Sequence, residues 1–158
     1  MSTAIPHNAA AFTTESAARA TCGKTLRGDG ARSHRGATTD SWAVEAGSVF
    51  VALRGERFDG HEFLGDATAR GATLVIVEHG HDAAGDADVL AVDDTLVAWG
   101  DLAHAHLSAW KSRGGRVVAI TGSAGKTTTK EMCASLLARV GAVHATAGNL
   151  NNRIGVPA

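Results

Sequence analysis

The residues with the clearest chemical meaning lie in the segment VVAITGSAGKTTT, residues 117–129. A glycine-rich turn before a helix binds phosphate, because backbone N–H groups converge there and the positive end of the helix dipole favours an anion. Lys126 can place its charge on the β- and γ-phosphates of a nucleotide, and the Thr127 hydroxyl can bind the Mg²⁺ that accompanies ATP. These two side chains are the catalytic candidates. The predicted ATP-binding residues are Gly122, Ser123, Ala124, Gly125, Lys126, Thr127 and Thr128.

A strand before this loop and a helix after it must hold it in place. The apolar, β-branched run 117–120 predicts a buried strand, and the helix is expected to begin at Lys126. The general phosphate-loop pattern has glycine five residues before Gly125, where this chain has Ile120, so the loop is the shorter 121–127 form. An ordinary turn between strand and helix is the alternative. The expected buried stripe of the helix is Cys133, Leu136, Leu137 and Val140.

Composition limits the class of protein. The chain has 158 residues, 44% of them apolar, with a net charge of −1 and no basic cluster, which argues against nucleic acid as a partner. Two cysteines, Cys22 and Cys133, fit buried thiols in a reducing cytoplasm. No signal peptide and no apolar run long enough to span a membrane is present. The expected chain is a cytoplasmic monomer.

Strands and helices of ordinary length alternate along the chain, which predicts an α/β fold. Residues 1–12 are expected to be loosely ordered. One helix is expected over 15–20, capped by Thr14 and closed by Gly23, and another over 61–70, ended by Gly71. The expected strands are 25–26, 36–38, 49–53, 73–77 and 89–92.

A longer helix is expected from Asp94, its cap, to about Arg113. Its predicted buried face is Leu96, Trp99, Ala103, His106 and Trp110. The domain boundary is placed near Asp93, giving domains 1–93 and 94–158, and residues 142–145 are expected to form a further strand. Residues 59–61 are expected to form a tight turn that caps the next helix, and a substrate role for them stays open. His79 and His81 lack a third ligand, so no metal site is expected there.

Three segments together resemble the Mur ligases of peptidoglycan synthesis, and in particular the branch that adds D-alanyl-D-alanine. They are TTDSWAVEAGSVFVALRGERFDGHEFLGDATARGAT from Thr38, TGSAGKTTTKE from Thr121 and ATAGNLNNRIGVP from Ala145. The resemblance implies a UDP-binding N-terminal α/β domain followed by the start of a Rossmann-like, phosphate-loop ATP-binding domain. It also implies that the chain is an N-terminal fragment, because a parallel sheet needs both faces covered and the residues after 116 cannot supply that.

The implied activity is ATP- and Mg²⁺-dependent amide-bond formation. A carboxylate of UDP-N-acetylmuramoyl-tripeptide would be phosphorylated to an acyl phosphate, and the amine of D-alanyl-D-alanine would then displace the phosphate, with charge neutralised by Lys126 and Mg²⁺. No partner other than these small molecules is expected. By the same resemblance, the residues that would contact the UDP-sugar are Thr39, Ser41, Glu56, Arg57, Phe58, Asn151 and Asn152.

One departure from the family pattern and two alternatives accompany this resemblance. The family usually has Asp-Ser-Arg where this chain has residues 40–42 with Trp42, so a cation has become an uncharged indole. The first alternative is the sister ligase that adds the third residue of the peptide. The second is a binding module without catalysis, which holds a UDP-sugar while the phosphate loop is only structural.

Overall fold

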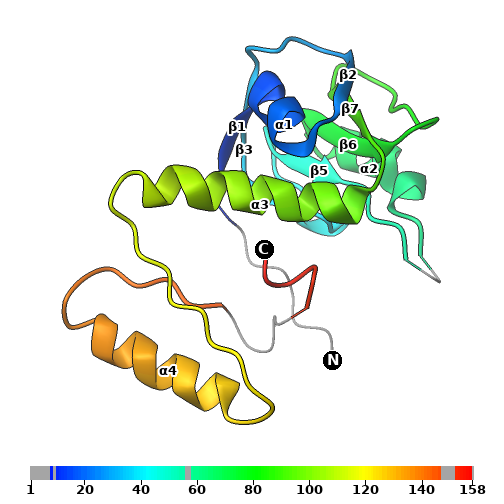
Figure 1. Ribbon diagram of the computed structural model, residues 1–158. Helices are drawn as coiled ribbons and strands as arrows, with labels where there is room; N and C mark the ends of the chain where they lie inside the picture. Colours follow the sequence, from blue (N-terminus) through cyan, green and yellow to red (C-terminus); the bar gives the residue numbers. More distant parts are fainter. Residues whose placement is uncertain (1–7, 9, 56–57, 147–151, 158) are drawn as a thin grey trace.

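A mixed five-stranded sheet lies at the centre of the computed structural model, which describes residues 8, 10–55, 58–146 and 152–157. The strand order is β2-β7-β6-β5-β4, and Figure 1 labels these strands except β4. The strands are β2 Lys24–Arg27, β4 Ala37–Thr38, β5 Val49–Val51, β6 Leu74–Glu78 and β7 Asp88–Val92. β4 to β7 are parallel, and β2 runs antiparallel to β7 at the edge. The predicted α/β class and these five strands are confirmed.

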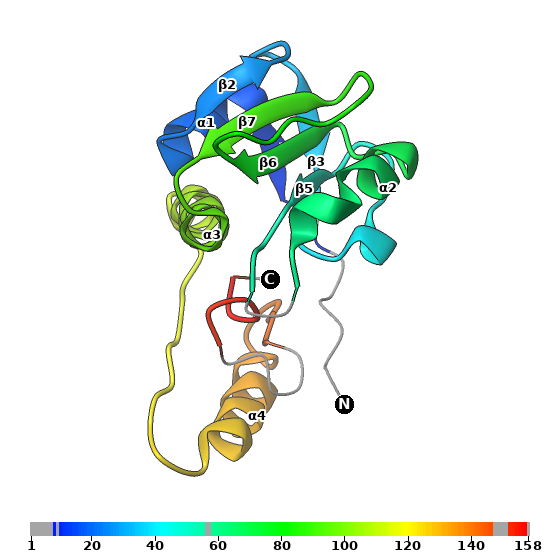
Figure 2. The same cartoon turned by 90° about the vertical axis from the view of Figure 1, so that its right-hand side faces the viewer.

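The central strands are buried on both faces, which is why they stood out as continuous apolar runs. Val49, Val51, Leu74 and Ile76 point to one core, in which α1 Thr14–Thr21 and α3 Thr95–Lys111 also pack. The alternate side chains point to a second core with α2 Leu64–Ala69. Figure 2 shows α2 separated from α1 and α3 by the sheet. Because successive side chains of a strand point to opposite faces, the same strands supply both cores, and the sheet lies between them.

A second, two-stranded sheet pairs β1 Ala11–Thr13 with β3 Ser33–Arg35 in antiparallel register. The prediction of loose order up to residue 12 is therefore wrong at Ala11 and Phe12, and Phe12 is buried in the core. Residues 1–7 and 9 lie outside the described residues. A short 3₁₀ turn, η1 Ser41–Ala43, follows β4, and a second one, η2 Gly60–Phe63, directly precedes α2.

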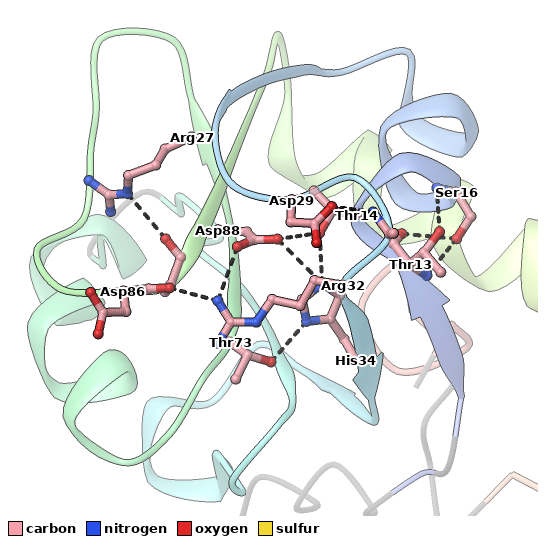
Figure 3. Close-up of polar contacts among 12 residues, drawn as sticks. Thr13, Thr14, Ser16, Arg27, Asp29, Arg32, His34, Thr73, Asp86 and Asp88 are labelled. Atoms are coloured by element: carbon pink, nitrogen blue, oxygen red, sulfur yellow. Dashed lines mark hydrogen bonds and ion pairs between the residues drawn. The ribbon is translucent and has the colours of Figure 1, made fainter.

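A buried polar network joins this small sheet to the amino ends of β6 and β7 (Figure 3). The Thr14 hydroxyl donates to Asp88, so it must accept the N–H of His34 Nε2 at 2.8 Å. His34 Nδ1 then accepts from the Thr73 hydroxyl at 2.8 Å. Arg32 donates to Asp88 at 3.1 Å. Burial lowers the pKa of His34, which agrees with a neutral ring in this tautomer.

The ends of α1 differ from the prediction by about one residue. Thr13, not Thr14, caps the helix and accepts from the Ser16 N–H, because Thr14 is already helical and its hydroxyl belongs to the buried network. The helix ends at Thr21, and its C-cap is Cys22 in a left-handed conformation, one residue before the predicted Gly23. Cys22 is exposed and Cys133 partly exposed, so the prediction of buried thiols is wrong.

The long helix α3 is confirmed, with Asp94 as its cap. Its buried face consists of Thr95, Ala98, Trp99 and Leu102. The predicted stripe is therefore correct only at Trp99, since His106 and Trp110 are exposed and Leu96 and Ala103 are partly exposed. The amino-terminal half of α3 packs into the core shared with α1, whereas its carboxyl-terminal half extends beyond the sheet (Figure 1). The boundary near Asp93 stays a prediction.

The segment after α3 differs most from the prediction. Residues 117–120 and 142–145 form no strand in the structure, and Val117 and Val118 are largely exposed. The helix α4 Lys126–Leu137 is confirmed, but none of its residues is buried, and Leu136, Leu137 and Val140 are exposed. Figures 1 and 2 both show α4 apart from the sheet, so these apolar residues have no layer to pack against. Within the described part of the chain, no helix has the length and apolar character needed to cross a membrane.

Candidate functional site

The phosphate-loop candidate lies where the sequence predicted it, directly before the first turn of α4. Gly122 has φ +151° and Gly125 has φ +77°, and Gly125 is the residue that caps the helix. A side chain would strain the backbone in the left-handed region at Gly125, which explains glycine there. No side chain caps α4, so the N–H groups of Lys126, Thr127 and Thr128 point out of the helix end. This geometry suits an anion.

Lys126 folds back over the loop. Its Nζ donates to the carbonyl oxygen of Gly122 at 2.5 Å, so the ammonium lies over the turn, and Thr127 and Thr128 are exposed on the first helical turn. Ser123 and Ala124 are exposed at the tip of the loop. One turn later, Lys130 donates to the Thr146 carbonyl and pairs with Glu131 at 3.0 Å. The loop therefore offers a positive charge, free amides and a hydroxyl within one short segment.

The second candidate site follows from the parallel strands. The carboxyl ends of β4 to β7 meet at one edge of the sheet, and ligands of open α/β sheets bind outside that edge. Thr39 and Ser41 come directly after β4, where Asp40 accepts from the Trp42 N–H and starts the η1 turn. Ser41 is buried and Thr39 is partly exposed. Both predicted residues therefore lie at the edge where a ligand is expected.

Trp42, the departure from the family pattern, is 74% exposed. The guanidinium of Arg70, at the end of α2, lies 4.7 Å from its ring centroid. A cation is thus still present beside this turn, supplied by Arg70 and held on the indole face.

The segment after β5 forms the next part of this edge. Arg54 and Asp59 form an isolated bridge, and Phe58 is 53% exposed and stacks on Phe63 with ring centroids 5.3 Å apart. Glu56 and Arg57 lie outside the described residues. The prediction of a tight turn over residues 59–61 is confirmed, since Asp59 accepts from the His61 N–H at 3.0 Å. That bond, more than any other contact, holds the pKa of Asp59 below its ordinary value.

A polar cluster at the same edge did not stand out from the sequence. It consists of Arg54, Asp59, His61 and Glu78, with the His81 ring stacked on the His61 ring at 4.0 Å between centroids. His79 lies beside it and contacts Asp93 at 3.1 Å. Among the described residues, no group of three or more His, Cys, Asp or Glu side chains is arranged so that it could hold a metal ion. The local signals of this cluster were the turn at residues 59–61, for which the sequence left a substrate role open, and the histidines at 79 and 81.

Asn152 belongs to a third location. Its side-chain oxygen accepts from the N–H groups of Ile154 and Gly155, and Trp99 Nε1 donates to the Ile154 carbonyl at 2.9 Å. An open groove of about 650 Å³ lies between this segment and α3, lined by Leu96, Val97, Gly100, Asn152, Arg153, Val156 and Pro157. Asn151 lies outside the described residues. The hydrogen bonds that Asn152 accepts from Ile154 and Gly155 lie within its own segment, and neither Thr39 nor Ser41 lines this groove.

Two models of one protein family match the chain. The model described as Mur ligase family, catalytic domain, matches residues 34–107, and the model described as Mur ligase middle domain matches residues 120–158. Together they include both candidate sites. The chain belongs to the Mur ligase family.

Individual relatives within this family have more specific names. The UDP-N-acetylmuramoyl-tripeptide--D-alanyl-D-alanine ligase of Escherichia coli K12 is 48% identical over 122 residues, 76% of this chain and 25% of that protein. A solved D-alanyl-D-alanyl ligase of Acinetobacter baumannii has a TM-score of 0.83 at 38% identity, over 95% of this chain and 33% of that one. The MurF ligase of Thermotoga maritima in complex with ADP has a TM-score of 0.66 at 36% identity, over 77% and 27%. The chain thus spans about a quarter of the length of its curated relatives.

Proposed function

We propose that this chain is the N-terminal part of an ATP-dependent amide-bond ligase of cytoplasmic peptidoglycan precursor synthesis, which adds D-alanyl-D-alanine to UDP-N-acetylmuramoyl-tripeptide. The observation that carries the proposal is the exposed glycine turn at the start of α4, with Lys126 folded over it, in a chain of this family. The curated relatives with this activity share 36–48% identity with the chain.

The residues at the turn fit a magnesium nucleotide. The backbone amides at the start of α4 would hold the terminal phosphates, and Lys126 would exchange its bond to the Gly122 carbonyl for the more favourable contact with phosphate. The Thr127 hydroxyl would be a ligand of Mg²⁺. ATP would supply the phosphoryl group that turns a substrate carboxylate into an acyl phosphate, which the amine of D-alanyl-D-alanine then attacks. Positioning and charge neutralisation are what this segment contributes.

The carboxyl edge of the sheet would hold the UDP part of the other substrate. Thr39 and Ser41 lie there, and the exposed face of Phe58 offers an apolar surface for a base or sugar ring. The substrates proposed are all small molecules, and the monomeric state and cytoplasmic location remain part of the proposal. Two free cysteines agree with a reducing compartment.

A pair of titrations tests the proposal on the 158-residue chain. UDP-N-acetylmuramoyl-tripeptide and Mg·ATP are added separately while thermal unfolding is followed. A ligand at one hundred times its Kd should stabilise the fold by about 2.7 kcal/mol. Lys126→Ala should remove the response to Mg·ATP and leave the response to the UDP ligand unchanged. Lys111→Ala, at the end of α3, is the matched control and should change neither.

The outcomes separate the ligase from the binding module. A response to the UDP ligand with none to Mg·ATP would favour a module in which the phosphate loop is only structural. A response to Mg·ATP that survives Lys126→Ala would show that the loop is not the nucleotide site. No response to either ligand would contradict both assignments.

A further inference from the structure

We propose that His61 is a positioning residue for the nucleoside end of the UDP-sugar, acting as a neutral imidazole protonated only on Nδ1. The proposal deepens the proposed function and rests on it. It places the uridine, not the diphosphate, against the cluster of Arg54, Asp59, His61 and Glu78 at the carboxyl edge of the sheet.

The tautomer follows from the two hydrogen bonds of the ring. The Glu78 N–H donates to His61 Nε2 at 2.9 Å, so Nε2 must present a lone pair. His61 Nδ1 lies 2.6 Å from the Asp59 carboxylate, which only accepts, so Nδ1 must carry the proton. A protonated ring could not accept from Glu78. Only the neutral ring with its proton on Nδ1 satisfies both partners.

These contacts close into a ring of four residues. Asp59 accepts from Arg54 Nε and Nη2 at 3.0 and 2.9 Å, and Arg54 Nη1 pairs with the Glu78 carboxylate at 3.0 Å. The Glu78 backbone then returns to His61. The ring joins the segment after β5 and the last residue of β6 to the turn before α2. It therefore fixes three pieces of backbone at the edge where a ligand binds in this class of sheet.

The backbone beside the ring is packed closely. The Gly60 N–H donates to the Leu53 carbonyl at 2.8 Å, and a Cβ on Gly60 would lie 2.8 Å from that oxygen. The His61 side chain is only 3% exposed, and one face of its ring lies on the partly exposed His81. A displacement of His61 would therefore be transmitted to Asp59 and Arg54, which reach the surface with side chains 28% and 49% exposed.

The charge of the cluster decides which part of the ligand it can contact. One guanidinium faces two carboxylates, and the imidazole is neutral, so the cluster as a whole is negative. Such a surface disfavours a diphosphate and accepts from the uncharged N–H and O–H groups of a base and a ribose. The cluster is thus a site for the nucleoside, and its rigidity depends on His61.

Three substitutions separate the two hydrogen bonds. His61→Asn keeps a donor toward Asp59 and loses the acceptor for Glu78. His61→Gln keeps an acceptor that can reach the Glu78 N–H and loses the Nδ1 donor. His61→Phe removes both but keeps a ring against His81. His104→Phe, at an exposed position on α3, is the matched control.

The experiment combines ¹⁵N NMR of the imidazole nitrogens with NMR titrations of uridine and of UDP. The unchanged chain should show an unprotonated Nε2 and a protonated Nδ1 for His61. His61→Phe should weaken uridine and UDP by the same factor, roughly tenfold for the loss of one such contact. His61→Asn and His61→Gln should each recover part of the affinity, and the control should match the unchanged chain.

Each contrary result has a distinct meaning. A protonated Nε2, or a folded His61→Phe chain that binds both ligands normally, would overturn the positioning role while leaving the proposed function in place. A loss confined to UDP would show that the cluster serves the diphosphate and would overturn the nucleoside assignment. Failure of the unchanged chain to bind UDP or uridine would refute the UDP site of the proposed function, and the role of His61 with it.

Discussion

Substitution of Asp88 by alanine should destabilise the domain far more than the loss of any surface ion pair. Asp88 is 2% exposed, and its carboxylate accepts from Thr14, which is fully buried, and from Arg32 at 3.1 Å. Removal of one partner of a buried pair costs about 3–5 kcal/mol. Because the Arg32 side chain is 37% exposed and can turn to water, the lower end applies, about 3 kcal/mol. That is a large share of the roughly 5–15 kcal/mol that stabilises a typical domain.

Urea unfolding followed by tryptophan fluorescence measures this loss. Trp99 is 2% exposed and should report the unfolding of the core. Arg19→Ala is the control, because it breaks the pair with Glu15 in which both side chains are at least 70% exposed, and it should cost about 0.5 kcal/mol or less. If Asp88→Ala lowers the free energy of unfolding by less than about 1 kcal/mol, or by no more than the control, the network is not a main stabilising contact between the two sheets.

Two further predictions concern pH and one glycine. Burial lowers the pKa of His34 in the folded chain, so between that value and about 6.5 the unfolded chain binds more protons. Stability should therefore be complete above this range and decrease as the pH falls through it, and His34→Gln should flatten that part of a pH series of urea unfolding. Gly71 has φ +104°, and a Cβ there would lie 2.9 Å from the Ala46 backbone, so Gly71→Ala should cost about 1–3 kcal/mol. Thermal unfolding of the two glycine variants measures this difference. Gly65→Ala, in open space on α2, should be neutral or stabilising.

The sequence predicted the central sheet because burial on both faces leaves a local pattern. β5, β6 and β7 are short apolar runs between polar turns, and such runs are typical of parallel strands. β1 and β3 had no such pattern. Each is three residues long, and they pair with each other at a separation of about twenty residues, held by the buried His34. Pairing at long range with polar side chains is not visible in a local window.

The wrong predictions after residue 115 have the opposite cause: a local pattern is present, but the packing that it needs is not. Residues 117–120 have the composition of a buried strand, and α4 has apolar residues at helical spacing, but strand propensity is expressed only against a neighbouring strand. In the described part of the chain, no strand pairs with 117–120. A helix needs no partner for its hydrogen bonds, so α4 forms while its apolar residues remain exposed. Local hydrogen bonding was therefore predictable where packing was not.

The same distinction applies to the two candidate sites. The glycine turn and the start of α4 could be predicted because the glycines, lysine and threonine are consecutive, and the helix that follows supplies the amides. The strand expected before the turn does not form, and phosphate binding by the turn stays a prediction. The cluster around His61 could not be predicted, because its members come from positions 54, 59, 61 and 78 and meet only when β5 and β6 pair.

The two sites also differ in charge, and this difference gives each proposed ligand its own place. The loop at α4 presents an ammonium and helix N-terminal amides, which would favour the phosphates of a nucleotide. The edge cluster presents one cation balanced by two carboxylates around a neutral ring, which disfavours phosphate. A ligase that uses ATP and a UDP-linked substrate must keep two nucleotides from competing for one site. In this chain, binding one nucleotide by its phosphates and the other by its nucleoside would achieve that separation before any contact with the reacting groups is made.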